Sequence, residues 1–180
     1  MSAKAPQELK RIATKDDIPF EPMRPIWQFW HERCPGALPS RNDFRIEEFL
    51  PWTAHIGAVR PEGDPPRFKV TLASRVMIEL NKIDATNRFF DQYMPPEALE
   101  FGCRPYLEAM KARTAVYDRL DADTIARKSF QRLVMPCSND GSAVDYFIIA
   151  IFYDRGFVEP HQQRTLYDHV LGKIPEGNTR

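Results

Sequence analysis

The segment KSFQRLVMPCSNDGSAVDYFIIAIFY, residues 128–153, carries the strongest strand pattern in this chain of 180 residues. Two runs rich in apolar and β-branched residues, 128–137 and 143–153, flank the sequence SNDG at residues 138–141. Such a cluster is typical of a hairpin connection, in which glycine adopts a positive φ at little cost. A third run of this kind covers residues 115–121. Three consecutive strands joined by short turns predict an antiparallel meander.

Two further strands are predicted upstream of the meander, at residues 55–60 and 67–72. The sequence between them, PEGDPP at residues 61–66, has the length and composition of a hairpin loop. Helical patterns over residues 74–80 and 97–113 then separate this hairpin from the meander.

The second of these helical patterns has one apolar stripe. Leu99, Cys103, Leu107 and Met110 follow one another at spacings of four, four and three, which predicts a buried face. Pro105 lies inside the pattern and is expected to break the helix into two pieces.

The elements together predict an α+β fold. We expect a five-stranded antiparallel sheet with helices on one face, an N-terminal helix over residues 24–33 and a C-terminal helix over residues 161–171. Helices that cover one face of a sheet leave a cavity between the two layers, where a small molecule would bind.

Composition excludes several classes of protein. The chain has 25 basic and 25 acidic residues, so it lacks the positive excess of a nucleic-acid-binding protein. Its 43% hydrophobic and 28% charged residues are typical of a soluble globular domain. The apolar run Tyr146–Tyr153 is too short to cross a membrane. Three scattered cysteines and a polar start without a signal sequence favour a cytoplasmic location.

The N-terminal helix has an unusually large apolar face. Ile26, Trp27, Phe29 and Trp30 lie within one short helix, so this face must pack against its own domain or against a second subunit. We expect these four residues to form a homodimer or partner interface.

Several short motifs, in this order, resemble a family of stand-alone bacterial PAS-like domains common in alphaproteobacteria. The resemblance covers residues 24–154. Its motifs are Trp27 and Trp30, LPSR at 38–41 with Asp43 and Phe44, Leu50-Pro51, Phe68 with Leu72-Ala73, FQRLVMP at 130–136, Ser138 with Asp140-Gly141, and Val144-Asp145. Thr71 and Ser74 depart from the family, which often has an arginine and a glycine at these positions.

The resemblance implies a PAS sensor fold that perceives a signal or binds a partner without catalysis. It divides the chain into a flexible N-terminal arm (1–22), a PAS-like domain that includes the N-terminal helix (23–154), and a C-terminal helix and tail (155–180). No kinase, cyclase or DNA-binding module is expected after the sensor region. The domain would therefore transmit its signal to a separate signalling protein or through self-association.

Strand alternation predicts which side chains would line a ligand pocket. They are Phe68, Val70, Met77, Leu80, Phe89, Phe90, Leu107, Met110, Phe130, Arg132, Phe147 and Ile149. The competing interpretation is that these side chains simply fill the core. Arg132 is the exception, because an arginine inside an apolar strand either extends to solvent or faces a buried carboxylate or an anionic ligand.

The sequence leaves the cofactor unknown. GCRPYL at residues 102–107 matches the flavin motif of blue-light PAS domains only faintly, since the asparagine before Cys103 is absent. The four histidines, His31, His55, His161 and His169, lie outside the helical middle section where a haem ligand is expected.

No catalytic or metal site is expected. HExxH, GxSxG, GxxxxGK[ST] and GxGxxG motifs do not occur. Asp118, Asp121 and Asp123 lack the glycine and glutamate of a calcium loop, so we interpret them as a solvated turn.

Two alternatives stay open beside the sensor. One is a small pocket enzyme of the nuclear-transport-factor-like kind, which would have a long N-terminal helix across the concave face of its sheet. A PAS sheet instead places its first strand centrally, beside its last. The other alternative is a protein-interaction module without a small ligand.

Overall fold

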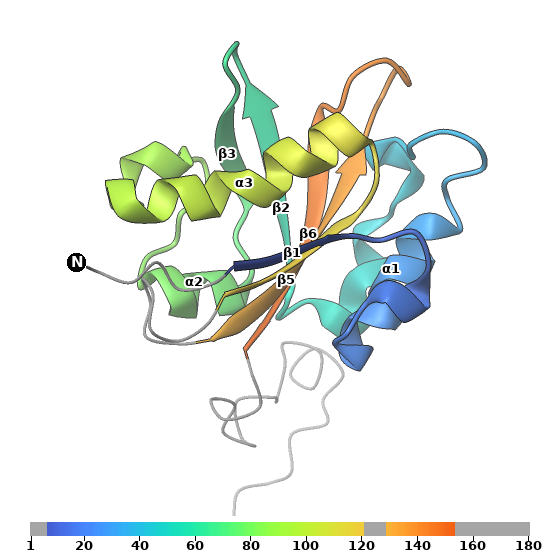
Figure 1. Cartoon of the computed structure of the whole chain (residues 1–180), viewed down its shortest axis with the longest axis horizontal. Helices are drawn as coiled ribbons and strands as arrows, with labels where there is room; N and C mark the ends of the chain where they lie inside the picture. Colours follow the sequence, from blue (N-terminus) through green and yellow to red (C-terminus); the bar gives the residue numbers. More distant parts are fainter. Residues whose placement is uncertain (1–6, 121–128, 154–180) are drawn as a thin grey trace, which may run out of the picture.

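An antiparallel sheet of six strands forms the centre of the computed structural model, which describes residues 7–120 and 129–153 (Figure 1). Its order is β1-β4-β5-β6-β2-β3, and every neighbouring pair is antiparallel. The strands are β1 (Gln7–Arg11), β2 (Ile56–Glu62), β3 (Arg67–Leu72), β4 (Val116–Leu120), β5 (Phe130–Cys137) and β6 (Tyr146–Tyr153).

The five strands predicted from the sequence are confirmed, as is the α+β class. The first of them, β2, pairs with the last, β6, so that Gly57 lies opposite Ile149. This is the central position that the resemblance to PAS domains implies for the first strand. All eight residues of β5 are buried because the strand has neighbours on both edges and packed side chains on both faces.

A sixth strand, β1, corrects the described part, residues 7–22, of the flexible arm expected over residues 1–22. It pairs with β4, and the Ile12 N–H continues the contact by donating to the Ala115 carbonyl oxygen at 2.9 Å. Ile12 and Ile18 are buried in the core. Two isolated isoleucines six residues apart do not make a recognisable pattern, and β1 is an edge strand with a mostly polar sequence, so the segment looks like an arm in the sequence.

Three α-helices accompany the sheet: α1 (Arg24–His31), α2 (Arg75–Asn81) and α3 (Pro96–Ala112). Ser74 caps α2, because its hydroxyl accepts a hydrogen bond from the Met77 N–H at 3.2 Å. Lys82 ends that helix in the left-handed conformation. Short 3-10 turns lie at η1 (Lys15–Asp17), η2 (Glu21–Met23), η3 (Arg41–Asp43), η4 (Ile46–Trp52) and η5 (Phe90–Gln92).

Side chains alternate between two cores, one on each face of the sheet. Val134 and Ile149 pack in the core that includes residues of α2 and α3. Leu133 and Ile148 pack in the core that includes residues of α1. Helices therefore cover both faces, and α1 is the element that occupies the second one (Figure 1).

The apolar face of α1 is occupied within the chain itself. Ile26, Trp27 and Trp30 are buried, and the Trp30 indole N–H donates to the Pro136 carbonyl oxygen on β5 at 3.1 Å. Phe29 is half-buried, with its ring 5.2 Å from that of Phe49. The interface expected from these four residues is thus corrected to an intramolecular contact. A homodimer stays a prediction, and its surface would have to lie elsewhere.

Helix α3 packs on the sheet through small residues. Its buried residues are Ala98, Pro105, Tyr106 and Ala109, whereas Leu107 is 46% exposed. The predicted stripe is confirmed in part: Leu99, Cys103 and Met110 are half-buried against the core, but Leu107 faces solvent, and Tyr106 and Ala109 are buried more deeply. The predicted break was wrong, since α3 continues through Pro105.

Two predictions fall outside the described residues: the helix over 161–171, and Asp121 with Asp123. In the described part of the chain, no helix combines the length and apolar character needed to span a membrane.

Candidate ligand-binding cavity

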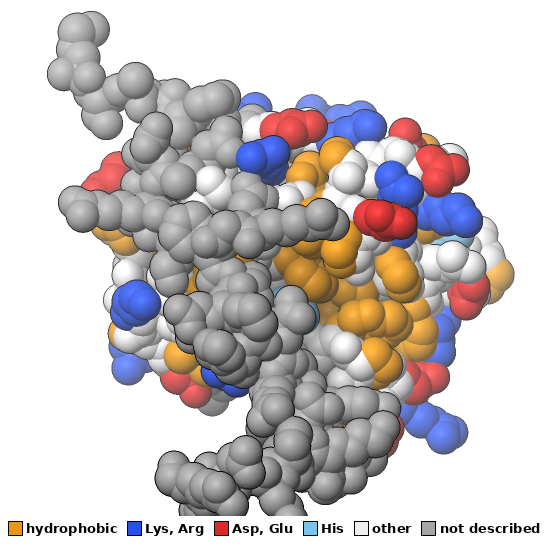
Figure 2. All heavy atoms as spheres, turned by 90° about the horizontal axis from the view of Figure 1, so that it is seen from below, with side chains coloured by type: hydrophobic (Ala, Val, Ile, Leu, Met, Phe, Trp, Pro, Cys, Tyr) orange, Lys and Arg blue, Asp and Glu red, His pale blue; other side chains and the backbone are white. Residues whose placement is uncertain are grey.

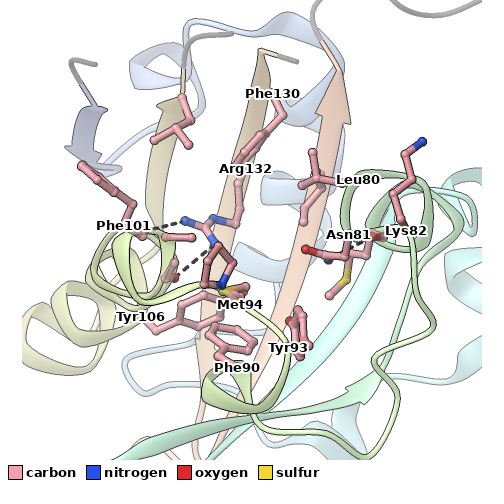
Figure 3. Close-up of a pocket in the computed structure, with 16 residues that line it drawn as sticks. Leu80, Asn81, Lys82, Phe90, Tyr93, Met94, Phe101, Tyr106, Phe130 and Arg132 are labelled. Carbon is pink, nitrogen blue, oxygen red and sulfur yellow. Dashed lines mark hydrogen bonds between the residues drawn. The ribbon is translucent and has the colours of Figure 1, made fainter. Parts of the chain in front are cut away.

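A cavity of about 350 Å³ lies between α2, η5, the first half of α3 and the sheet (Figure 3). Its volume is at the lower end of the range for small-molecule sites. Its lining residues are Met77, Leu80, Asn81, Lys82, Phe90, Tyr93, Met94, Pro95, Ala98, Phe101, Gly102, Tyr106, Leu120, Phe130, Arg132 and Ile151.

Aromatic rings form much of the wall. The Phe90 ring meets the Tyr106 ring edge-on at 5.3 Å and the Tyr93 ring at 6.2 Å, and behind them Tyr106 packs on Phe147 at 5.2 Å. Edge-to-face contacts of this kind hold rings in fixed orientations. The wall is therefore a rigid apolar surface suited to a flat or aliphatic ligand.

Gly102 allows α3 to pack against the segment before it. A Cβ at this position would lie 2.8 Å from the Met94 sulfur, which is closer than atoms pack. The glycine thus leaves room for the flexible Met94 side chain at the edge of the cavity.

Arg132 and Asp118 form a buried ion pair at the cavity wall. Nε donates to Oδ1 at 2.8 Å and Nη2 donates to Oδ2 at 2.9 Å, and the two side chains are 5% and 0% exposed. Burial alone would lower the pKa of Arg132, but the Asp118 carboxylate and Tyr106 together outweigh burial, and the pKa is raised. The arginine therefore stays charged, and its charge is balanced by a carboxylate of the protein. The prediction that Asp118 lies in a solvated turn was therefore wrong, because Asp118 is buried in the core.

The same guanidinium also holds α3. Nη1 donates to the Gly102 carbonyl oxygen and Nη2 to the Phe101 carbonyl oxygen, each at 3.3 Å (Figure 3). Pro105 has no N–H for the Phe101 carbonyl, which is four residues earlier in the helix. Arg132 supplies a donor there, which explains how α3 passes through Pro105.

The Tyr93 hydroxyl is buried and has no hydrogen-bond partner among residues 7–120 and 129–153. Burial raises the pKa of Tyr93, so the phenol keeps its proton and stays a donor. An unpaired buried hydroxyl is costly, and a ligand in the cavity could supply the missing acceptor.

Asn81 presents a fixed acceptor. Its amide nitrogen donates to the Met77 carbonyl oxygen at 2.9 Å, which orients the side chain. Figure 3 shows the amide oxygen on the cavity side, across from Arg132. Lys82 follows in the chain, but it is exposed and its side chain extends away from the cavity (Figure 3).

The structure brings five of the predicted pocket residues to the cavity: Met77, Leu80, Phe90, Phe130 and Arg132. Four others, Phe68, Val70, Phe147 and Ile149, fill the adjacent core.

Three predicted residues lie away from the cavity. Leu107 is exposed on the outer face of α3, and Met110 packs at the margin of the core. Phe89 is half-buried beneath the guanidinium of Arg67, which lies 4.0 Å from its ring centre.

The sequence analysis missed Asn81, Tyr93 and Tyr106 as cavity residues. Tyr93 lies in the mixed segment after α2, where no period assigns a side chain to a face. Tyr106 follows Pro105, at which a break was expected. The sequence offered one indication for Tyr106. It follows Gly102 by four residues, so the two share a helix face, and the glycine allows another segment to pack closely on that face.

Cys103, His31 and His55 lie outside the cavity, while His161 and His169 fall outside the described residues. Cys103 is half-buried outside the cavity, and burial raises its pKa to about 11. His55 stacks on Phe152 at 3.8 Å and His31 on Trp27 at 4.4 Å, and neither lines the cavity. Among residues 7–120 and 129–153, no group of three or more acidic, histidine or cysteine side chains is placed to hold a metal ion.

A second hollow of about 570 Å³ lies toward the other core, between η3, η4 and strands β2 and β6. Arg41 and Arg75 are among its lining residues, but no buried side-chain polar atom there lacks a hydrogen-bond partner in the described chain.

Around the same core are half-buried aromatic side chains, among them Phe20, Trp52 and Phe152. Figure 2 shows hydrophobic side chains gathered on one face of the molecule, with charged groups around them.

No protein-family model and no curated protein matches the chain. Among solved structures, it is similar to a sensory box sensor histidine kinase from Vibrio cholerae, with 14% identity and a TM-score of 0.42 over 60% of this chain and 85% of that one. It is also similar to an RNA-binding light-oxygen-voltage receptor, with 13% identity and a TM-score of 0.44 over 95% of this chain and 44% of that one. At these identities neither match assigns an activity.

Proposed function

We propose that this chain is a PAS-like sensor domain that binds a small molecule between α3 and the sheet and acts by recognition rather than catalysis. The observation that carries the proposal is the cavity of about 350 Å³, with a rigid aromatic wall and a buried hydroxyl that has no partner. Side chains normally pack to high density, so a cavity with an unpaired polar group favours a site for a ligand.

The position of the cavity links binding to the rest of the domain. Its wall includes Arg132, which holds β4 through Asp118 and α3 through two carbonyl oxygens. A ligand that contacts this wall would alter the position of α3 relative to the sheet. A separate signalling protein would read that change.

Strand order favours the sensor over the alternative enzyme. β2 lies centrally beside β6, and the N-terminal helix α1 has only eight residues. The enzyme fold would need a long helix across the concave face of the sheet. Both carboxylate oxygens of the buried Asp118 accept hydrogen bonds from Arg132, so the carboxylate is already engaged within the protein.

Extraction of the purified protein tests the proposal. The wild type and an Ala98→Leu variant are denatured, and the released small molecules are compared by mass spectrometry. Ala98 is a buried residue of the cavity wall, so leucine would occupy ligand space. Leu107→Ala is the matched control, because Leu107 is exposed on the same helix.

We expect a compound in the wild-type and Leu107→Ala extracts that is absent from the Ala98→Leu extract. Three indistinguishable extracts would contradict the proposal and favour an interaction module that works without a ligand.

A further inference from the structure

The charges around the cavity restrict the ligand that it can take. Arg132 is the buried cation of the wall, and both of its charge-assisted bonds to a carboxylate go to Asp118. An anionic ligand would have to compete with that carboxylate, and a cationic ligand would approach the guanidinium. A charged ligand would lose its hydration without gaining a counter-charge, so the cavity favours a neutral molecule.

Two polar groups of the wall remain for such a molecule. The Tyr93 hydroxyl is a buried donor without a partner among the residues that the structure describes, and the Asn81 amide oxygen is an acceptor whose orientation is fixed by the bond to Met77. Figure 3 places both residues on the same side of the cavity, across from Arg132. A group that accepts one hydrogen bond and donates another would satisfy both.

We propose that Tyr93 and Asn81 form the polar end of the site and select a neutral, largely apolar ligand that carries a carboxamide or an equivalent donor-acceptor group. The ligand carbonyl accepts from Tyr93, the ligand N–H donates to Asn81, and its apolar body lies against Phe90 and Tyr106. This inference rests on the proposed function, since it names the ligand class of the same cavity.

Three probes of nearly equal size test the charge preference. Benzamide is neutral, benzoate is an anion and benzamidinium is a cation, and all three share a flat ring with a three-atom head. Their dissociation constants are measured by NMR titration of the full chain. We expect benzamide to bind about tenfold more tightly than either charged probe.

Tyr93→Phe separates a binding role from a structural one. It removes only a hydroxyl that has no partner in the described part of the chain, so the melting temperature should not fall. Benzamide affinity should drop about fivefold, which is the value of one neutral hydrogen bond. A lower melting temperature with unchanged benzamide affinity would overturn the assignment of Tyr93.

Asn81→Asp tests the acceptor at constant size. The variant replaces the amide with a carboxylate of nearly equal size, which loses the bond to the Met77 carbonyl oxygen and adds a negative charge, so the preference should move from benzamide toward benzamidinium. Lys111→Met is the control, because it also removes one lysine charge but lies on the exposed side of α3 outside the cavity lining, and it should leave the order of affinities unchanged.

The outcomes distinguish the two proposals. If a charged probe binds the wild type best, or if Asn81→Asp leaves the order unchanged, the polar end is assigned wrongly while the cavity remains a binding site. If none of the three probes binds, both the ligand class and the proposed function are overturned.

Discussion

Pro105 and Arg132 both determine the hydrogen bonding of one backbone atom, the Phe101 carbonyl oxygen. Proline removes the helical donor for the Phe101 carbonyl oxygen, and Arg132 Nη2 lies 3.3 Å from that oxygen. A residue of β5 thus completes the hydrogen bonding of a helix on the face of the sheet, and the same guanidinium lies at the wall of the cavity.

This relationship predicts energetic coupling between the two residues. In Pro105→Ala the helix regains its own N–H donor, so Arg132→Met should cost about 1 kcal/mol less in free energy of unfolding there than in the wild type. Chemical denaturation of both single variants and the double variant measures this coupling. Strictly additive effects would show that Arg132 does not support the helix at Phe101.

The buried ion pair predicts unequal effects of single and double substitutions. Arg132→Met leaves the Asp118 carboxylate buried without its counter-charge, and should lower the free energy of unfolding by about 3 to 5 kcal/mol. Asp118→Leu combined with Arg132→Met removes both charges and should recover most of that loss. Denaturation midpoints measure both effects, and a double variant no more stable than the single one would contradict this account of the pair.

The cavity itself predicts a difference between two alanines of α3. Ala98 lines the cavity, so Ala98→Leu has room for its side chain and should change the free energy of unfolding by less than about 1 kcal/mol. Ala109 is fully buried away from it, so Ala109→Leu should cost about 1 to 3 kcal/mol through overpacking. Equal losses in thermal or chemical unfolding would mean that no usable space lies beside Ala98.

The cysteines predict slow thiol chemistry in the folded chain. Burial raises the pKa of Cys103 to about 11 and that of Cys34 and Cys137 to about 12. At pH 8 only about 0.1% of Cys103 is then the reactive thiolate. Labelling with a disulfide reagent should be slow at pH 8, accelerate toward pH 11 and become rapid in denaturant.

Cys103→Ser is the matched control for the labelling experiment, and it should remove the thiol that responds at the lowest pH. Folding raises the pKa of these thiols, so the folded state favours their protonated form. Their contribution to the free energy of unfolding is therefore fully present below the ordinary thiol pKa, and it is lost as the pH rises toward 11. A thiol of the native protein that reacts within seconds at pH 8 would contradict the burial described for all three.

The strands were predictable because their side chains alternate or form continuous apolar runs bounded by turn residues, as in residues 128–153. β1 was not, because an edge strand with one half-buried leucine has no such pattern. In α3 the predicted stripe included Leu107, which faces solvent, and omitted Tyr106 and Ala109, which are buried. Pro105 was expected to break the helix, so the positions just after it were not assigned to the buried face.

Arg132 could be identified as unusual from its place in an apolar strand. Its partner Asp118 could not, since an aspartate near two others in sequence looks like part of a solvated turn. The pairing depends on the register of β4 and β5, which sets the two residues opposite each other. Tyr93 and Asn81 likewise reach the cavity through tertiary packing.

A titration of ¹⁵N-labelled protein with benzamide, followed by amide chemical shifts, tests the central claim most directly. We predict that the shifts change at Asn81, Tyr93, Phe101 and Gly102, which surround the cavity between α3 and the sheet. Changes confined to Gly57, Ala73 and their neighbours in the second hollow, or no changes at all, would contradict the claim that this cavity is the binding site.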